Sequence, residues 1–425
     1  MKIAIVGTGI AGNVAAHLLH RAHDITVYEA VGHIGGHTHT HRIELDGEVQ
    51  QIDTGFIVFN HRTYPNFVSL LAELGVTSHD SAMSFSVRNE VSGLEYNGTS
   101  LNSLFAQRVN LLRPSFLRMV GDILRFNREA LRLLADDDHE ITLGDYLAEH
   151  DYSRQFVDDY LVPMGAAIWS TDPQRMLGFP ARFLVRFMHN HGMLTVNDRP
   201  TWRVISGGSA RYVERLVAPW RHLIRLNCAV TQVRRRSDGV WISARGAPIA
   251  RYDHVFFACH ADEALRVLAD PSPAEREILG ALPFQRNEAV LHTDTSLLPR
   301  RRLAWAAWNS HVLPQARGRV ALTYNMNILQ GLTSRHTFCV TLNRSDAIDP
   351  ARVLKRIDYQ HPLFTPAGIA AQRRHHEISG VHRTHYCGAY WRYGFHEDGV
   401  VSAQQAVQRF EQGHHHEQCD LPRVA

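Results

Sequence analysis

The sequence predicts an α/β fold in which a parallel-sheet domain is interrupted by an inserted α+β domain. Residues 2–29 carry a β-α-β pattern, because two short β-branched runs flank a helical run. Residues 203–268 again show a pattern of this kind, with a glycine pair, a helix and two strand-like runs. Residues 104–134, between these segments, are strongly helical and rich in Leu, Phe and Arg, which is not typical of a parallel-sheet domain.

The length and composition indicate a folded protein with more than one core. The chain has 425 residues, and this length favours two domains or one domain with a large insertion. Hydrophobic residues make up 44% and charged residues 20%, as in ordinary globular proteins. The formal net charge is only +3 and the basic residues are spread along the chain, so we expect no nucleic-acid partner.

The cysteines and the N-terminal residues favour a cytoplasmic location. The five cysteines have no CxxC or metal-ligand spacing, and an odd number does not suit a disulfide framework. The first strand begins at about Ile3, which leaves no room for a signal peptide, and no apolar run reaches the roughly 18 residues of a membrane span. Any membrane contact is therefore expected to be peripheral, on the inner face.

The alternation between segments typical of a parallel-sheet domain and segments that are not predicts how the chain divides between the two domains. The first domain is built from three separated segments and the second from two. The expected segments are 1–75, 203–270 and 381–413 for the first domain, 76–202 and 271–380 for the second, and a tail at 414–425.

A glycine fingerprint predicts that the first domain binds a dinucleotide. Gly7, Gly9 and Gly12 form G-x-G-x-x-G directly after the first strand and at the start of the first helix. Gly7 permits the tight turn, Gly9 lets the backbone approach a pyrophosphate, and Gly12 allows the helix to pack closely on the strand. Glu29 ends the second strand, where its carboxylate can accept hydrogen bonds from ribose hydroxyls.

The residues after Glu29 separate FAD from NAD. They follow the pattern E-A-x-x-H-x-G-G-H-x-x-T, and this segment resembles the flavin-containing amine oxidase and phytoene desaturase superfamily. The resemblance recurs at the D-x-G strand 53–56, at the glycine pair 207–208, at Val230 and in the motif 388–400. It implies a Rossmann-like FAD-binding domain with FAD as cofactor.

The resemblance also implies the residues that hold the cofactor. They are Gly7, Gly9, Ile10, Ala11, Gly12, Glu29, Ala30, Gly35, Gly36, His37, Thr38, Asp53, Thr54, Gly55, Phe56, Val230, Gly388, Glu397, Asp398, Gly399 and Val400.

Histidines replace arginines in the flavin segment. His33 and His37 stand where many relatives have arginine, so the phosphate charge must be neutralised weakly or by other residues such as Arg42 or Arg62. The alternation of His37, His39 and His41 would place three imidazoles on one face of a strand, as a metal site could. Because the alternation overlaps the flavin segment, we favour a strand that faces the cofactor or solvent, and we predict no metal.

A missing lysine moves the expected chemistry away from simple amine oxidation. Amine oxidases of the superfamily usually keep a lysine that reaches flavin N5 through a water, on a substrate-domain strand. The matching stretch, 286–291, contains no lysine, and neither Lys2 nor Lys355 is an obvious substitute. No catalytic acid or base can be assigned.

Aromatic and polar residues indicate where the substrate binds. Tyr390, Trp391 and Tyr393 near the C-terminal motif are candidates for an aromatic cage beside the flavin, with His396 as the nearest titratable group; core packing is the alternative. The candidate pocket residues, which could equally be structural, are Trp169, Trp308, Asn309, Tyr324, Asn325 and Asn327.

Residues 108–128 interleave apolar side chains with five arginines. Part of this segment can form a basic amphipathic helix that lies on an anionic membrane and admits an acyl substrate. A core-packing helix with a solvated face is the alternative, and arginines that bind a fatty-acid carboxylate are a third.

The leading hypothesis is an FAD-dependent oxidoreductase that desaturates, oxidises or isomerises an acyl chain or other apolar lipid by hydride transfer to flavin N5. Residues 305–309 and 324–330 most resemble a group of bacterial FAD-binding proteins, and this resemblance implies an association with cyclopropane-fatty-acid-synthase-like methyltransferases. The alternatives are a peroxide-producing amine oxidase and a non-catalytic FAD-binding partner of a lipid-modifying enzyme.

Overall fold

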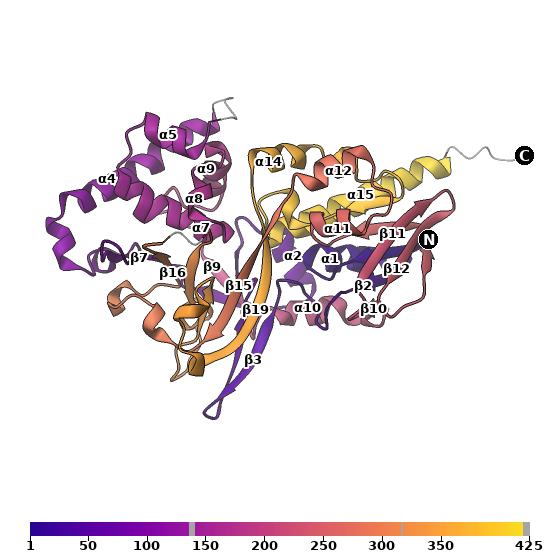
Figure 1. Cartoon of the computed structure of the whole chain (residues 1–425). Coiled ribbons are helices and arrows are strands. Elements are labelled where there is room, and N and C mark those ends of the chain that lie inside the picture. The colour runs from indigo at the N-terminus through magenta and orange to yellow at the C-terminus, as the bar shows by residue number, and fades with distance from the viewer. Residues whose placement is uncertain (136–140, 316–317, 420–425) are drawn as a thin grey trace, which may run out of the picture.

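The computed structural model describes residues 1–135, 141–315 and 318–419, and the side chains up to residue 413. Two lobes lie side by side (Figure 1). The lobe on the right contains the N-terminus and the glycine fingerprint, and we call it the nucleotide lobe. The lobe on the left contains most of the segment that the sequence predicts to be inserted, and we call it the substrate lobe.

A five-stranded parallel sheet forms the centre of the nucleotide lobe. Its strands are buried on both faces, which explains why they read as short apolar runs and not as alternating patterns. In spatial order they are β10 (Ile224–Arg225), β2 (Asp24–Tyr28), β1 (Lys2–Val6), β14 (His254–Phe257) and β20 (Thr384–Tyr386). The sheet therefore combines strands from three separated segments of the chain.

Different elements cover the two faces of this sheet. Helices pack on one face: α1 (Ile10–Leu19), α2 (Pro65–Glu73), α10 (Ala210–Val217), η4 (Ala218–Leu223) and α15 (His396–Cys419). The other face is covered by a small antiparallel sheet and helices: β11 (Val230–Arg236), β12 (Gly239–Ala244), β13 (Ala250–Tyr252), α11 (Ala261–Val267), α12 (Pro273–Gly280), α14 (Pro366–Arg373), η9 (His375–Glu377) and η10 (Ala389–Trp391).

The substrate lobe combines helices with a mixed seven-stranded sheet. Its strands, in spatial order, are β19 (Val353–Pro362), β15 (Phe284–His292), β18 (Cys339–Leu342), β17 (Ala321–Asn325), β16 (Trp308–Val312), β7 (Phe85–Asn89) and β8 (Glu95–Asn97). Its helices are α3 (Leu101–Leu104), η1 (Arg108–Leu112), α4 (Pro114–Glu129), η2 (Ala130–Leu134), α5 (Leu143–Glu149), α6 (Arg154–Phe156), η3 (Val157–Leu161), α7 (Val162–Trp169), α8 (Pro173–Met176), α9 (Ala181–Asn190), η5 (Thr295–Leu297), η6 (Arg302–Ala304), α13 (Met326–Gln330), η7 (Ser345–Ala347) and η8 (Pro350–Arg352).

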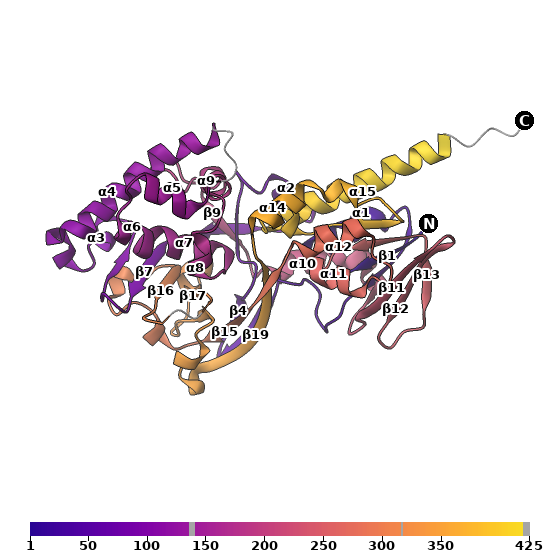
Figure 2. The same cartoon turned by 45° about the horizontal axis from the view of Figure 1, so that its top comes forward.

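Long strands and short sheets join the two lobes. The antiparallel pair β15 and β19 runs from the substrate lobe toward the nucleotide lobe in both views (Figure 2). The hairpin of β3 (Thr40–Leu45) and β4 (Glu48–Asp53) lies beside this pair, and a three-stranded sheet is formed by β5 (Val58–Asn60), β9 (Trp202–Ile205) and β6 (Ser78–Ser81). The fold class predicted from the sequence is therefore the one observed.

Packing moves some segments across the predicted domain division. Ile278 of α12 and Ala371 of α14 are buried in the core of the nucleotide lobe, although the sequence assigns both helices to the second domain. Helix α15 runs to Cys419, into the predicted tail, and residues 420–425 lie outside the described part of the chain. Over the described residues, no helix is both long and apolar enough to span a bilayer.

Candidate cofactor and substrate site

The turn after β1 has the geometry of a phosphate cradle. Gly7 has φ +104°, and a Cβ atom there would lie 2.9 Å from the carbonyl oxygen of Ala258. A Cβ atom at Gly12 would lie 2.0 Å from the carbonyl oxygen of Gly7, so this position requires glycine. A Cβ atom at Gly9 would have no heavy atom within 4 Å, and no described side chain caps α1. The backbone of Gly9 is thus open to a ligand at the positive end of α1.

Two further glycine segments converge on this cradle. A Cβ atom at Gly36 would lie 3.0 Å from Cα of Gly9, so the second glycine pair sits directly against the first. A Cβ atom at Gly399 would lie 2.5 Å from Cγ2 of Ile10, so the first turn of α15 packs against the first turn of α1. Two helix N-termini and the Gly35–Gly36 segment therefore meet at one place, which suits an anionic pyrophosphate.

Glu29 supports the cradle from the end of β2. Its Oε2 atom accepts hydrogen bonds from the amide and hydroxyl of Thr8, and its Oε1 atom accepts one from the amide of Val31 at 3.0 Å. A carboxylate offers about four acceptor positions. The structure therefore adds a bracing role that the sequence did not reveal, and leaves room for one ribose hydroxyl.

The flavin-segment histidines separate into two groups. His37 stacks on His361 at 5.2 Å between ring centroids and lies 6.2 Å from His260, with Tyr359 edge-on at 5.0 Å. Burial, together with these neighbouring imidazoles, lowers the pKa of His37 well below its usual value. The His37 ring is therefore neutral at pH 7.

The second histidine group corrects the expected alternation. His39 lies between His33 and His41, with ring centroids 4.2 Å and 4.0 Å away, while His37 makes its contacts elsewhere. The strand β3 starts only at Thr40, so His37 and His39 precede the regular alternation. Within the described part of the chain, no three His, Cys, Asp or Glu side chains are grouped to hold a metal ion.

His396 begins α15 and is enclosed by polar and aromatic groups. Its Nε2 atom lies 2.7 Å from the hydroxyl of Tyr212 and 3.2 Å from that of Thr38. Its ring stacks on Phe56 at 3.5 Å. Burial lowers the pKa of His396 to about 3, so this ring is neutral as well. The structure thus brings the predicted residues Thr38, Phe56 and His396 together.

Asp53 and Thr54 connect the lobes. The Asp53 carboxylate accepts hydrogen bonds from the amide and hydroxyl of Ser209, from the Thr40 hydroxyl and from the Gln330 amide. Its pKa is raised to about 6 by burial, although these donors oppose the shift. Asp53 therefore joins β4 to α10 and α13, a structural role that the D-x-G motif did not indicate.

The two acids of the C-terminal motif are occupied by backbone amides. Glu397 accepts hydrogen bonds from the amides of Asn66 and Phe67 at 3.1 and 2.9 Å and therefore caps α2. Asp398 accepts one from the amide of Phe395 at 3.0 Å. The sequence resemblance implied that Glu397 and Asp398 hold the cofactor. In the structure both carboxylates accept hydrogen bonds from backbone amides at the start of a helix.

Replacing Glu397 by glutamine is expected to lower stability by about 1–2 kcal/mol, because a charged acceptor is lost from the α2 N-terminus. The affinity for FAD should change less than threefold. Chemical denaturation and FAD titration of the variant measure the two effects. A large loss of affinity at unchanged stability would instead assign Glu397 to the cofactor.

The three aromatic residues of the expected cage point to different cores. Tyr390 and Trp391 are buried in the core of the nucleotide lobe, and Tyr390 lies edge-on to Phe284 at 5.6 Å. Tyr393 instead contacts the substrate lobe, 4.8 Å from Phe183 between ring centroids. The core-packing alternative therefore holds for Tyr390 and Trp391, while Tyr393 contributes to an aromatic packing surface of the substrate lobe.

Trp169 belongs to that same aromatic surface. Its Nε1 atom donates to the carbonyl of Tyr393 at 3.2 Å, and its ring lies 4.9 Å from Phe187. We name the set of residues that share these contacts the aromatic wall: Trp169, Phe183, Phe187, Phe364 and Tyr393. The sequence identified Trp169 and Tyr393, but the phenylalanines of α9 carry no local motif.

The predicted pocket amides are structural. Asn309 is fully buried, and its amide group bonds Ser86, Ala306 and Thr323. Asn325 accepts the amide of Ile328 at the start of α13. Asn327 bonds the backbone of His336 and Phe338. The structural alternative is thus the correct one for all three.

Trp308 and Tyr324 remain candidates for the pocket. Their rings are edge-on at 5.3 Å, and the buried Nε1 atom of Trp308 has no hydrogen-bond partner among the described residues. The buried Nδ1 atom of His39, in the segment that follows the second glycine pair, also has no hydrogen-bond partner among the described residues. Such donors and acceptors fit a polar ligand that would satisfy them.

Asn287 lies on β15, in the stretch 286–291 that the sequence resemblance matches to the lysine-bearing strand of amine oxidases. It is fully buried on β15, and its Nδ2 atom donates to the carbonyl of Ser170 at 3.0 Å and to Nδ1 of His361 at 2.9 Å. Lys2 starts β1 at the far end of the parallel sheet, and Lys355 is exposed on β19. Neither lysine replaces the missing one.

Arg42 and Arg62 do not supply the missing phosphate charge. Arg42 pairs with Glu44 and Arg62 with Asp198, at 3.1 and 2.8 Å, on the surface. His260 lies three residues after the end of β14, at the start of α11, and the sequence did not single it out, although a position just beyond the carboxyl end of a central parallel strand is a usable signal. His361 and Tyr359 have no such signal.

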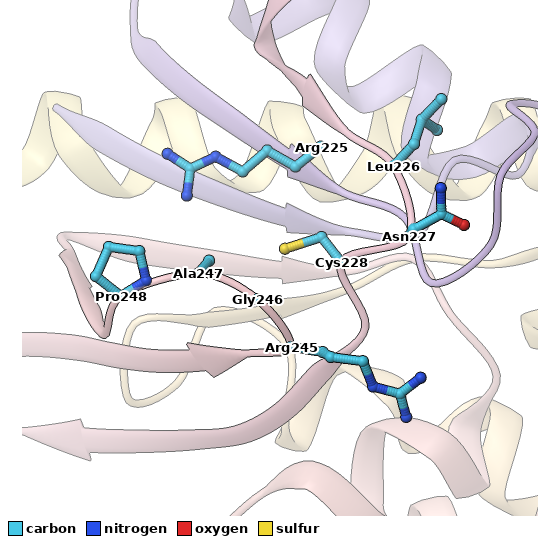
Figure 3. A pocket seen from close by; sticks show the side chains of 8 residues that line it. All are labelled: Arg225, Leu226, Asn227, Cys228, Arg245, Gly246, Ala247 and Pro248. Atoms are coloured by element: carbon cyan, nitrogen blue, oxygen red, sulfur yellow. The ribbon is translucent and has the colours of Figure 1, made fainter.

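A surface pocket adjoins Glu29 and is lined by residues 225–228 and 245–248 (Figure 3). Cys228 donates its amide to the carbonyl of Glu29 at 2.8 Å. The guanidinium groups of Arg225 and Arg245 point away from one another in Figure 3, and Arg225 lies over the ring of Tyr28. Because the two charges do not converge, we assign no anion to this pocket.

Together, the parallel sheet, the open backbone at Gly9 and the converging helix N-termini define a dinucleotide-binding oxidoreductase fold. The family model for flavin-containing amine oxidoreductase matches residues 10–307. The chain belongs to this family, which makes it a flavin enzyme with FAD as cofactor.

Curated relatives are distant. An L-amino-acid oxidase from Siganus canaliculatus is 23% identical over 303 residues, covering 69% of this chain and 55% of that protein. A flavin-dependent L-tryptophan oxidase from Lentzea aerocolonigenes is 37% identical over 79 residues, covering 18% of this chain and 16% of that protein. The chain thus spans about half, or less, of the length of these relatives.

Solved structures share the fold over nearly the whole chain. Cyclohexylamine oxidase from Brevibacterium oxydans aligns with a TM-score of 0.70 at 16% identity, covering 97% of this chain and 99% of that one. A fatty acid isomerase from P. acnes aligns with a TM-score of 0.67 at 16% identity, covering 96% and 98%. At such identities the likeness shows the fold alone.

Proposed function

We propose that the protein is an FAD-dependent oxidoreductase acting on an acyl chain or another apolar lipid, with a desaturated, oxidised or isomerised product. The observation that supports this proposal best concerns Asn287. Its buried, neutral amide lies on the strand that the sequence resemblance matches to the one where amine oxidases usually have lysine. Bound FAD would supply the chemistry by accepting hydride at N5. The chain then has to bind, orient and shield the substrate.

The proposed path of FAD follows the three glycine segments. The adenosine end would lie by Glu29, Ala30 and Val230, the pyrophosphate at Gly9, Ile10, Ala11 and Gly35–Gly36, and the flavin end by His37, Thr38, Phe56 and His396 beside the first turn of α15. This path is supported by the open backbone of Gly9 and by Gly36 and Gly399, which contact the first helix. The remaining motif residues, Asp53 and Glu397 among them, would support the path from behind.

Neutral groups surround the flavin end of this path. Burial lowers the pKa of His361 to about 4 and that of His37 well below its usual value. Because Asn287 donates to Nδ1 of His361, the neutral His361 ring carries its proton on Nε2 and can donate only from there. Such a site stabilises no carboxylate or phosphate of a substrate, which favours an uncharged reacting segment.

The aromatic wall supports the apolar half of the proposal. Its five rings pack against one another, and apolar rings of this kind would offer dispersion contacts to an acyl chain and exclude water. Aromatic faces also attract cations, so the wall alone does not separate lipids from amines. The second candidate function is therefore an amine oxidase that produces peroxide, supported by the family and by the fold shared with cyclohexylamine oxidase.

Anaerobic mixing of the FAD-loaded protein with a fatty-acyl panel and an amine panel distinguishes the candidates. We expect acyl substrates to bleach the flavin absorbance, or to be isomerised without net bleaching because the hydride returns. Amines should bleach it at least about 100-fold more slowly, because no lysine serves the site. Product analysis by mass spectrometry accompanies the spectra.

The opposite ranking would assign the amine oxidase function. Bound FAD that responds to neither panel, together with a stable complex on co-purification with a lipid-modifying methyltransferase, would assign the non-catalytic role instead. The variant Tyr393→Ala is the matched test of the wall: it should raise the KM for acyl substrates and leave FAD binding intact.

A further inference from the structure

The outer edge of the substrate lobe carries an unusual set of exposed apolar side chains. Seven of the eighteen large apolar side chains that are strongly exposed in the described chain lie between residues 101 and 131. Leu112 is 84% exposed and Leu101 is 77% exposed. We name the following residues the leucine surface: Leu101, Val109, Leu111, Leu112, Leu117, Leu124 and Leu303.

The fold does not require these side chains. On α4, the core is served by Phe116, Met119 and Phe126, which are fully buried. Leu117 and Leu124 project from the opposite side of the same helix. The core-packing alternative for residues 108–128 therefore explains one face of the helix and leaves the second apolar face without a partner.

Exposed arginines lie on or next to the same elements as the leucine surface. Of the nearby acids, Glu129 is partly exposed and pairs with Arg128 at 3.7 Å, and two others are buried. The exposed arginines are Arg108, Arg113, Arg118, Arg128, Arg300, Arg301 and Arg302. Asp122 is buried and accepts the amide of Ser153, and Glu95 is buried and accepts the amides of Arg300 and Arg301. The described part of this surface is thus positively charged around an apolar centre.

The position of the surface suits contact with a large flat partner. Helices α3 and α4 lie at the outer end of the substrate lobe, farthest from the nucleotide lobe, in the second view, and α4 forms the same outer edge in the first (Figures 1 and 2). Helix α3 contacts η6, which places Leu303 beside Leu101. The elements that carry these exposed side chains thus lie at the outer end of the substrate lobe.

We propose that the leucine surface docks the protein on an anionic lipid bilayer. Leucines would enter the acyl boundary while the arginine side chains reach the headgroups, as interfacial helices arrange these residue types. A nucleic-acid partner would gain no binding energy from contact with seven apolar side chains. A single partner helix would not contact so many flanking arginines. No described helix spans a bilayer, so the contact is peripheral.

Docking on a bilayer follows from the leucine surface alone. Delivery of acyl chains from the bilayer to the aromatic wall rests on the proposed function. Phe116 and Phe126 on the inner face of α4 belong to the same core as Trp169 and Phe187. A bilayer held at the outer face would therefore lie against the lobe that contains the aromatic wall.

Co-sedimentation with vesicles tests the docking without any turnover. FAD-loaded protein is mixed with vesicles of phosphatidylcholine alone or of phosphatidylcholine with phosphatidylglycerol. We expect binding to the anionic vesicles only, weakened by salt. The variants L111S/L112S and R113E/R118E should each lower the partition coefficient by about tenfold or more. The control I249S/R276E changes exposed residues of the nucleotide lobe and should bind as the unmodified protein does.

Equal binding of all four proteins, or no binding to anionic vesicles by the unmodified protein, would overturn the proposal. Thermal melting of each variant checks that the fold is retained. If both variants lose vesicle binding and no lipid reduces the flavin, the leucine surface is confirmed as a docking site and the proposed reaction is rejected. If detergent-dispersed lipid reduces the flavin but the protein binds no vesicles, the docking proposal is rejected and the proposed reaction is supported.

Discussion

Replacing Gly9 by aspartate is expected to weaken FAD binding by at least about 100-fold, or roughly 2.7 kcal/mol. Gly9 has φ −65° and open space at its Cβ position, so any residue fits the backbone. An aspartate there would place its own carboxylate at the N-terminus of α1, where the pyrophosphate is proposed to lie. Fluorescence titration with FAD measures the affinity.

The same substitution should leave the flavin-free fold intact or slightly more stable, because aspartate is a favoured N-cap residue. This separates a binding defect from a folding defect. G98D is the control, since a Cβ atom at Gly98 would likewise have no heavy atom within 4 Å. Equal affinities of G9D and G98D for FAD would contradict the cradle. G12A, in contrast, should destabilise the protein itself, because its Cβ atom would meet Gly7 at 2.0 Å.

Acidification from pH 6.5 to 5 is expected to unfold the flavin-free protein. Burial is the main cause of lowered pKa values at eight histidines. The pKa is lowered to about 3 for His396, to about 4 for His39, His191, His292, His361 and His375, and well below the usual value for His37 and His311. The unfolded chain binds protons at these groups near pH 6.5, so their stabilisation is lost as the pH falls.

Two carboxylates act in the opposite direction. Burial raises the pKa values of Asp53 and Asp398 to about 6, so the folded state binds their protons first and gains stability on acidification. Each proton is worth about 1.4 kcal/mol per pH unit, and the histidines outnumber the acids. Stability should therefore fall on the order of 5 kcal/mol per pH unit near pH 5.5, against a typical total of about 5–15 kcal/mol.

Denaturant unfolding at a series of pH values measures this slope. His292 and His311 are remote from the proposed cofactor path and belong to one hydrogen-bonded row that also contains Thr323 and Thr341. The double variant H292Q/H311Q should lose about two proton equivalents from the slope. Unchanged stability between pH 7 and pH 5 would show that these histidines are not held neutral.

The sequence predicts the fold and the cradle well because both have local signals. Gly7 needs its backbone conformation, and Gly12, Gly36 and Gly399 need close approaches to neighbouring atoms, while Gly9 leaves open space for a ligand. The return of the chain to the parallel sheet is visible mainly in the apolar run of β14, since a central strand that is buried on both faces has few polar positions.

The substrate side is less predictable because it depends on contacts across long sequence distances. The aromatic wall joins Phe187 to Tyr393, and Asn287 meets His361, without a motif at either end. Polar residues in apolar strands were equally consistent with a pocket or with structural bonds, and Asn309 shows the second outcome. The roles of Asp53 and Glu397 likewise follow from partners more than 150 residues away.

The central claim is that FAD binds along the cradle formed by Gly9, Gly36 and the first turns of α1 and α15. Its most direct test is calorimetric titration of the flavin-free protein with FAD and, separately, with NAD. We predict one FAD per chain, with a melting temperature that rises with FAD concentration, and at least about 100-fold weaker binding of NAD. No saturable binding of FAD, or equal affinity for the two dinucleotides, would contradict the account.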